Sequence, residues 1–173
     1  TTRYSYDNNG NLREVFDPRG PEYDTVYTYD HLNRRITVTL AAGSPLPATT
    51  YYRYDQGGNI ISVTDPRGDA SATSFTTHYF YDANNRLIET VDPMGLVTTN
   101  TYDAFGNILT TVDPYGNETE HTYDAINRLL TLTVDGAYTT TTTYLDGGSF
   151  IRVTDRRSNS TTYVYDGNGR LLS

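Results

Sequence analysis

One short block, a tyrosine followed by an aspartate and then by a turn and an aliphatic residue, recurs along almost the whole chain. Its tyrosines are Tyr6, Tyr29, Tyr54, Tyr81, Tyr102, Tyr123, Tyr144 and Tyr165, and in the weakest copy Leu145 replaces the aspartate. The first three intervals are 23, 25 and 27 residues, and the last four are all 21. Such regular spacing over about eight copies is typical of a repeat protein, in which each unit buries the apolar face of its neighbour.

A second block lies between the early copies of the first and has the same turn spacing. It reads Asp17-Pro18-Arg19-Gly20, Asp65-Pro66-Arg67-Gly68, Asp92-Pro93-Met94-Gly95 and Asp113-Pro114-Tyr115-Gly116. Asp at the first position and Gly at the fourth indicate a type I turn that ends on a left-handed residue, which suits a four-residue hairpin connection ending in a bulge. The predicted turn-forming residues are Asp7, Gly10, Asp17, Pro18, Gly20, Asp65, Gly68, Asp92, Gly95, Asp113 and Gly116. Asn33, Asn85 and Asn127 substitute for Gly in three copies, because Asn tolerates the left-handed conformation best after Gly.

The segments between the turns are short and rich in Thr, Val, Ile, Leu and Tyr, as in residues 86–91 and 96–102. These residue types favour strands, and no helical periodicity stands out. The sequence therefore predicts an all-β fold of tandem antiparallel β-hairpins, about eight units of ~21 residues, spanning residues 1–173 as a single array. The sheet is expected to form a curl or spiral, because flat sheets of many strands are unusual. We also expect the array to be a segment of a longer chain.

Period-2 alternation predicts how the hairpins pack. It places Tyr27 on the same face as Tyr29, and Tyr52 on the same face as Tyr54. One column of aliphatic residues on the intervening strands consists of Leu12, Ile60, Leu87, Ile108, Leu129 and Leu171. The tyrosine and aliphatic columns should meet as cross-strand pairs and form the core.

Charge and composition exclude several classes of protein. A net charge of −8 and a pI near 4.7 argue against nucleic-acid binding, which needs clustered basic residues. Without cysteine the chain has neither disulfides nor thiolate metal sites. No apolar run is long enough for a membrane span.

The Tyr-Asp-x-x-Gly-Asn/Arg-Leu block and the Asp-Pro-x-Gly turn resemble the YD-repeat or Rhs-repeat family. That family includes bacterial Rhs and wall-associated toxins, the cocoon components of Tc toxins, and teneurins. The resemblance extends from Tyr4 to Leu171. It implies hairpins wound into a large β-spiral shell, which often encloses a toxin domain or presents an adhesive surface, in a secreted or cell-surface protein. The core-terminating segment of the family has no match, so no self-cleavage is inferred.

The repeated aspartates also suggest calcium. Asp7, Asn9 and Asn11 have the one-three-five oxygen spacing of a calcium loop. In other copies Phe105 or Ile126 occupies the third position, and Arg86, Arg128 or Arg170 the fifth. Turn capping by the Asp side chain explains the pattern better, so we predict no metal and no cofactor, with weak calcium binding at a single rim as an alternative.

Catalytic chemistry finds little support in the sequence. His31, His78 and His121 lie at different phases of the repeat and predict no metal triad. The acidic residues that stand apart from the turns are Glu14, Glu22, Glu89, Glu118 and Glu120, and nothing singles out a facing pair among them. The chain is therefore predicted not to be an enzyme, and a glycoside hydrolase-like activity is the least favoured alternative.

The favoured hypothesis is a non-catalytic structural scaffold of an exported or cell-surface protein, as a shell, stalk or fibre segment. Its expected partners are neighbouring repeats or further copies of the chain, and a toxin passenger domain. A carbohydrate- or surface-receptor-binding module is the alternative. Tyr115 would then be a contact residue, because it lies at a turn tip where other copies have Arg or Met.

Overall fold

The computed structural model describes residues 1–68, 74–145 and 150–173. In these residues the regular elements are β-strands and one 3-10 turn, η1 (Pro21–Tyr23), which confirms the predicted all-β hairpin array. Contacts within the chain divide it into two compact units, Thr1–Leu96 and Val97–Ser173.

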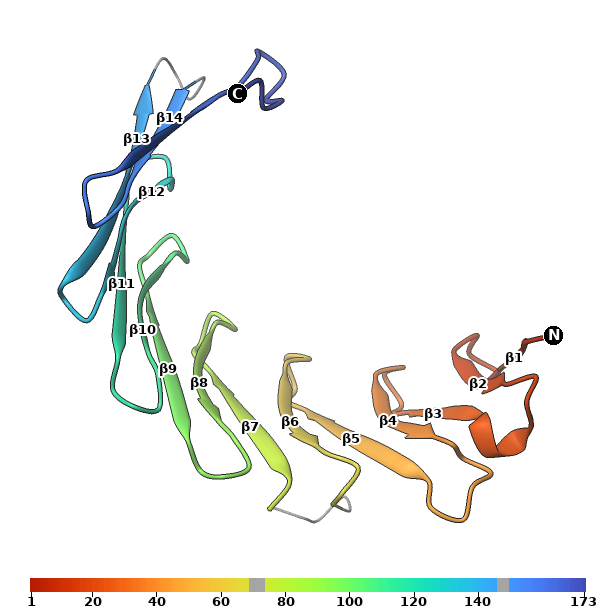
Figure 1. The fold of residues 1–173 in the computed structure, drawn as a ribbon. Coiled ribbons are helices and arrows are strands. Elements are labelled where there is room, and N and C mark those ends of the chain that lie inside the picture. Colours follow the sequence, from red (N-terminus) through yellow and green to blue (C-terminus); the bar gives the residue numbers. More distant parts are fainter. Residues whose placement is uncertain (69–73, 146–149) are drawn as a thin grey trace. The chain divides into compact units, whose positions relative to one another are not determined.

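Each unit is an open antiparallel sheet in which the strands follow one another in chain order (Figure 1). The first unit contains β1 (Arg3–Tyr6), β2 (Leu12–Phe16), β3 (Thr25–Tyr29), β4 (Arg35–Leu40), β5 (Ala48–Tyr54), β6 (Ile60–Thr64), β7 (Thr76–Tyr81) and β8 (Leu87–Val91). The second contains β9 (Val97–Tyr102), β10 (Ile108–Val112), β11 (Glu118–Tyr123), β12 (Leu129–Val134), β13 (Tyr138–Leu145), β14 (Phe150–Thr154) and β15 (Ser160–Val164).

A β-bulge recurs at the same place in six of the Tyr-Asp hairpins. In the first, Tyr6 pairs with Leu12 and Ser5 pairs with Glu14, so that Arg13 is an extra residue on β2. The extra residues of the other five hairpins are Ile36, Ile61, Ile88, Leu109 and Leu130. A bulge bends its strand and increases the local twist. Its repetition explains why the sheet of each unit is curled (Figure 1).

The two faces of the sheets differ chemically. The predicted pairing of the tyrosine and aliphatic columns is confirmed, for example at Tyr54 with Ile60 and at Tyr81 with Leu87. Tyr29 is an exception because Arg35 lies opposite it. The other face carries cross-strand hydroxyl pairs, such as the 2.7 Å contact between the Oγ1 atoms of Thr122 and Thr131.

The expected apolar core is wrong in one respect. Among the described residues no hydrophobic side chain is fully buried, and the buried residues are Asp24, Ser62, Thr64 and Thr76. The physical reason is that each unit is a single sheet whose strands mainly contact the strands beside them. Most tyrosine and aliphatic side chains of these columns are consequently half-buried against one another, whereas Tyr6 and Leu171 in the terminal hairpins are exposed.

Candidate functional site

Each Tyr-Asp turn is organised by the carboxylate of its aspartate. Asp7 Oδ1 accepts hydrogen bonds from the backbone N–H groups of Asn9 (2.9 Å) and Asn11 (2.8 Å), and Oδ2 accepts one from Asn11 Nδ2 (2.9 Å). The bond from the Asn11 side chain lowers the pKa of the Asp7 carboxyl. The same pattern is formed by Asp30, Asp55, Asp82, Asp103, Asp124 and Asp166, with Asn or Arg at the fifth position. These oxygens are engaged within the turn.

The fourth and fifth residues of the first six of these turns alternate along the chain, whereas the turn of Asp166 has Gly169-Arg170. The six pairs are Gly10-Asn11, Asn33-Arg34, Gly58-Asn59, Asn85-Arg86, Gly106-Asn107 and Asn127-Arg128. The fifth-position Asn of each Gly-Asn turn donates to Oδ1 of the left-handed Asn in the next turn, at 2.8 Å for Asn11 with Asn33, 2.8 Å for Asn59 with Asn85, and 2.9 Å for Asn107 with Asn127. Glycine has no side chain to accept this bond, so the alternation joins hairpins in pairs. The sequence reasoning missed this role, although the alternation is visible in the sequence.

Arginine at the fifth position makes a different link to the next hairpin. Arg34 Nε donates to Asp30 Oδ2 at 2.7 Å, and its terminal nitrogen donates to the backbone carbonyl of Asp55 at 2.8 Å. The same guanidinium lies over the ring of Tyr54, 4.7 Å from its centroid. The Arg34 side chain thus bonds to the aspartate of its own turn and also contacts the tyrosine and the aspartate of the next Tyr-Asp block.

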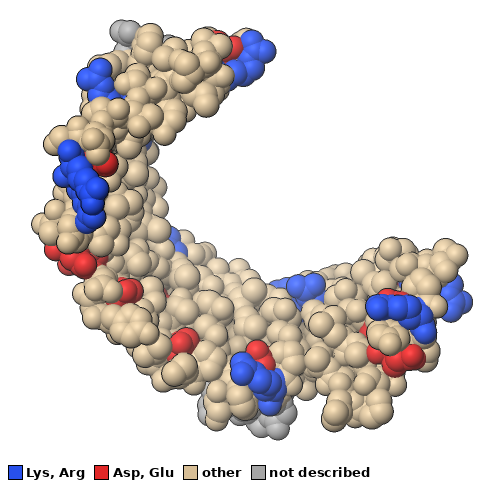
Figure 2. Space-filling model, viewed as in Figure 1, with Lys and Arg blue, Asp and Glu red and all other residues tan. Residues whose placement is uncertain are grey.

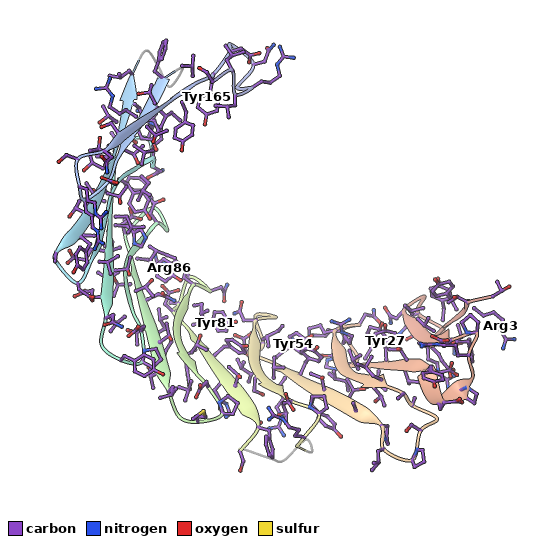
Figure 3. The ribbon with its side chains drawn as sticks, viewed as in Figure 1. Arg3, Tyr27, Tyr54, Tyr81, Arg86 and Tyr165 are labelled. Atoms are coloured by element: carbon purple, nitrogen blue, oxygen red, sulfur yellow. The ribbon has the colours of Figure 1, made fainter. Side chains whose placement is uncertain are left out.

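In most blocks the tyrosine hydroxyl bonds to the hairpin before it. Figure 3 labels two of these tyrosines, Tyr54 and Tyr81. The hydroxyl of Tyr54 donates to the carbonyl of Arg35 at 2.8 Å, and that of Tyr81 donates to the carbonyl of Ile60 at 2.9 Å. Equivalent bonds join Tyr29 to Leu12, Tyr123 to Ile108 and Tyr144 to Leu129. Burial raises the pKa of Tyr81, so the hydroxyl stays a donor. The tyrosines therefore connect successive hairpins.

The Asp-Pro turns form the second set of predicted turn residues. In each, the N–H of the fourth residue donates to the carbonyl of the first, at 3.2 Å for Gly20, 2.9 Å for Gly68, 3.0 Å for Gly95 and 3.0 Å for Gly116, as it does at 3.1 Å for Gly10 in the first Tyr-Asp turn. Asp92 Oδ1 accepts from the N–H of Met94, and Asp113 Oδ1 from that of Tyr115. Pro18 occupies the second position of the turn after β2.

Two of these turns hold an ion pair. Arg19 Nε lies 2.9 Å from Asp17 Oδ1, and Arg67 Nε lies 2.8 Å from Asp65 Oδ1. The hydrogen bond from Arg19 lowers the pKa of Asp17 to about 2. The arginines at these turn tips are thereby directed to their own carboxylates.

Tyr115, the predicted contact residue, is 81% exposed between β10 and β11. Over the described ranges no three His, Asp or Glu side chains come together in a way that could hold a metal ion. His78 lies in β7 and His121 in β11, while His31 is in a turn. On the face that Figure 2 shows, acidic and basic side chains are interspersed among uncharged ones. No helix in the described part of the chain is long and apolar enough to cross a membrane.

Comparison with known proteins identifies the repeat. The RHS Repeat family matches residues 6–45, 81–118 and 102–140, which together make up more than half of the chain. The chain belongs to the RHS repeat family. Among curated proteins, no match to this RHS repeat chain was found.

Solved structures with the same fold come from Tc toxins. A Tc holotoxin pore of Photorhabdus luminescens superposes with a TM-score of 0.70 at 19% identity, covering 94% of the RHS repeat chain. A complex described as TcdB2-TccC3-Cdc42 gives a TM-score of 0.70 at 18% identity and covers 98%. The RHS repeat chain spans only 9% and 10% of the lengths of those two chains. At this identity the likeness concerns the fold.

Proposed function

We propose that this RHS repeat array is a non-catalytic structural scaffold, a wall segment of a shell in a secreted or cell-surface protein. One observation carries the proposal: the residues that define the repeat bond to their own turn or to the neighbouring hairpin. The Asp carboxylates cap turns, the fifth-position Asn side chains reach the next turn, and the Tyr hydroxyls reach the preceding strand. Side chains that form hydrogen bonds within the array hold neighbouring hairpins together, as a structural scaffold requires.

The proposed partners are further repeats of a longer chain and a toxin passenger domain enclosed by it. The Tc toxin structures support this, because each contains a chain about ten times as long with a region of the same fold. A half-buried tyrosine face of the kind described would serve as a wall with neighbouring repeats on either side.

Protease protection tests the scaffold role. The array would be expressed with the sequence that adjoins it in its parent chain, and with a protease-sensitive reporter in place of any passenger. A shell should protect the reporter, and the double change Tyr81→Phe and Tyr123→Phe, which removes two bonds between hairpins, should reduce protection. A reporter cleaved as fast as the free reporter would overturn the shell. Turnover of a glycoside that one carboxylate change abolishes would overturn the non-catalytic assignment.

A binding module for a glycan or a surface receptor is the second candidate, because the ring of Tyr115 is 81% exposed. Exposed aromatic rings of this kind can stack on sugars and other planar or apolar partners. A glycan array should then show binding that Tyr115→Ala abolishes. Met94→Ala, at the same position of another Asp-Pro turn and 83% exposed, is the matched control.

A further inference from the structure

A second column of tyrosines runs along the first unit, beside the tyrosines of the Tyr-Asp blocks. Its members lie two residues before the block tyrosines, on alternate strands, and are Tyr4 on β1, Tyr27 on β3, Tyr52 on β5 and Tyr79 on β7. We call these four residues the tyrosine ladder. The equivalent residues of the second unit are Asn100, His121, Thr142 and Tyr163. An unbroken ladder is therefore a feature of the first unit.

The ladder hydroxyls are not used by the fold. The block tyrosines donate to carbonyl groups of the preceding hairpin, whereas the hydroxyls of Tyr27, Tyr52 and Tyr79 form no hydrogen bond within the described residues. In that part of the chain, the buried side-chain polar atom that lacks a partner is Nδ1 of His121, so the three ladder hydroxyls reach the surface. They are available as hydrogen-bond donors to a ligand.

One charged side chain lies within the ladder. Arg35 occupies the aliphatic column, where most other hairpins have Leu or Ile. Its guanidinium carbon lies 5.9 Å from the centroid of the Tyr27 ring and 5.4 Å from that of the Tyr52 ring, one hairpin further along. Arg35 is exposed and forms no ion pair within the described ranges. The surface thus presents an unpaired positive charge between two aromatic rings.

Aliphatic side chains form the floor between the ladder rings. Val38 lies opposite Tyr27, and Val63 lies opposite Tyr52. Beyond Tyr52 the floor opens into a pocket of about 180 Å³ lined by Ile60, Val63, Tyr79, Tyr81 and Leu87. This lining carries no charge, and the volume suits one small apolar group such as a proline ring.

The spacing of the ladder limits the conformation of a ligand that contacts all of it. β3, β5 and β7 are each two strands apart in the sheet, which is about 10 Å. Successive tyrosines are also offset along the strands, because Val38 pairs with Tyr27 on one side and with Thr50 on the other. Figure 3 shows Tyr27, Tyr54 and Tyr81 on the inner side of the curl of the first unit, where rings lie closer together than their strands. A ligand must therefore offer a contact group roughly every 10 Å.

A polyproline II helix has a repeat of this length. It has three residues per turn and rises about 3.1 Å per residue, so the same side returns after about 9 Å. An extended β-strand instead returns to the same side after two residues, or about 7 Å. The polyproline II helix makes no internal hydrogen bonds, so its carbonyl groups can accept from tyrosine hydroxyls while its proline rings pack on aromatic side chains.

We propose that the tyrosine ladder binds a proline-rich segment of a partner protein in the polyproline II conformation, with an acidic residue of that segment at Arg35. The hydroxyls of Tyr52 and Tyr79 donate to carbonyl groups of the segment, and a proline ring occupies the pocket beside Val63. Charge complementarity at Arg35 fixes the register of the segment along the ladder. This surface is distinct from Tyr115 and does not depend on the scaffold role.

Titration of the full chain with a capped decaproline, in which one central residue is replaced by aspartate, tests the proposal. The peptide is about 31 Å long and spans the distance from β3 to β7, about 19 Å. Isothermal calorimetry should show one saturable site, and lysine in place of the aspartate should weaken binding about fivefold. A Gly-Ser peptide of equal length with the same aspartate should bind much more weakly, because it loses more conformational entropy.

Three variants separate the contacts. Tyr79→Phe keeps the ring and should weaken binding about fivefold, the size expected for one neutral hydrogen bond, while the thermal transition is unchanged. Arg35→Leu restores an aliphatic residue to its column, so it should fold, and it should abolish the preference for aspartate over lysine. Tyr163→Phe, at the equivalent position of β15, is the matched control and should leave the affinity unchanged.

Three results would overturn the proposal. One is the absence of saturable binding of the decaproline peptide by a chain that its thermal transition shows to be folded. Another is equal or tighter binding of the Gly-Ser peptide, which would make the ladder a site for flexible acidic segments. The third is a preference for aspartate over lysine that Arg35→Leu leaves intact.

Discussion

The aspartate at the first position of a turn is the residue on which the local geometry depends most. Its carboxylate accepts two backbone N–H groups and one side-chain donor, as at Asp103 with Phe105 and Asn107. The pKa of Asp103 is lowered, first by the Asn107 side chain, and that of Asp17 falls from 3.8 to about 2 through Arg19. The ionised carboxylates are therefore part of the folded state.

This coupling predicts loss of stability in acid. Because the folded pKa values lie below the unfolded ones, the stabilisation is fully present above about pH 4 and is lost as the pH falls toward 2. The thermal transition temperature should be constant from pH 7 to about 5 and decrease between 4 and 2. A transition temperature as high at pH 2 as at pH 7 would contradict this prediction.

A second prediction at this scale concerns the tyrosine hydroxyls. Tyr81→Phe removes the 2.9 Å bond to the carbonyl of Ile60 and leaves the ring in place. The free energy of unfolding should fall by about 0.5–1.5 kcal/mol, measured by urea denaturation. The control is Tyr79→Phe on the same strand, because the hydroxyl of Tyr79 makes no hydrogen bond in the part of the chain that the structure describes, and its stability should not change.

At the scale of the hairpin, the joining of neighbours depends on which residue takes the left-handed position. Asn127 adopts φ 63° and presents Oδ1 to Asn107, whereas Gly106 adopts φ 93° with no side chain to present. Both residues adopt the positive φ that the turn requires, and only asparagine also forms a contact with the preceding hairpin.

A double-mutant cycle isolates this contact. Asn107→Ala also loses the bond to Asp103, and Asn127→Gly retains a residue suited to positive φ. The coupling energy between the two changes should be about 0.5 kcal/mol, because the bond is exposed to solvent. The control is a second cycle, which combines Asn107→Ala with Gly106→Asn in the same turn. Gly106→Asn offers the Asn107 side chain no equivalent acceptor in a neighbouring hairpin. A coupling energy of zero in the first cycle would show that the bond does not join the hairpins energetically.

At the scale of each unit, the described residues include no fully buried hydrophobic side chain, so stability is built from contacts between adjacent hairpins. A local change should therefore have local effects. Tyr123→Phe should speed amide hydrogen exchange in β10, β11 and β12, next to the lost bond to Ile108, and much less in β15 of the same unit. Uniform acceleration across the second unit, measured by NMR, would instead indicate one cooperative core.

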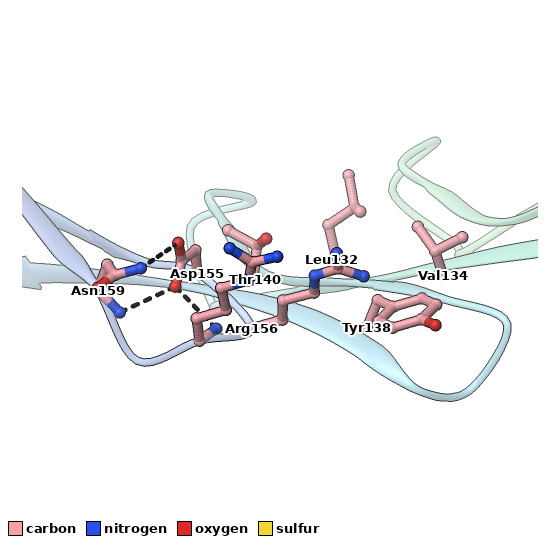
Figure 4. A pocket seen from close by; sticks show the side chains of 8 residues that line it. Leu132, Val134, Tyr138, Thr140, Asp155, Arg156 and Asn159 are labelled. Carbon is pink, nitrogen blue, oxygen red and sulfur yellow. Dashed lines mark hydrogen bonds between the residues drawn. The ribbon is translucent and has the colours of Figure 1, made fainter.

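The sequence predicts what depends on local spacing. The turns, the strands and the cross-strand columns follow from Asp-x-x-Gly and period-2 alternation, as at Tyr81 with Leu87. A bulge was predicted at the end of the turn, but the extra residue further along the strand was not, although two aliphatic residues in succession, Leu87-Ile88 and Leu129-Leu130, break the alternation where it occurs. The half-buried packing could not be predicted, because the residue types that fill a closed core also line a single sheet. The contact between the Arg156 guanidinium and the Tyr138 ring, 4.4 Å from its centroid, joins two different hairpins and could not be predicted from local spacing (Figure 4).

The alternation of Gly-Asn and Asn-Arg turns has a consequence for how such a chain can change in length. A donor asparagine must be followed by a hairpin that offers an acceptor, as Asn11 is by Asn33 and Asn59 is by Asn85. Duplication or loss of a single hairpin would place two donors or two acceptors in succession. Arrays of this kind should therefore gain or lose repeats two at a time. A gene duplication that preserves the hydrogen bond between the two asparagines would add about 42 residues, twice the 21-residue interval.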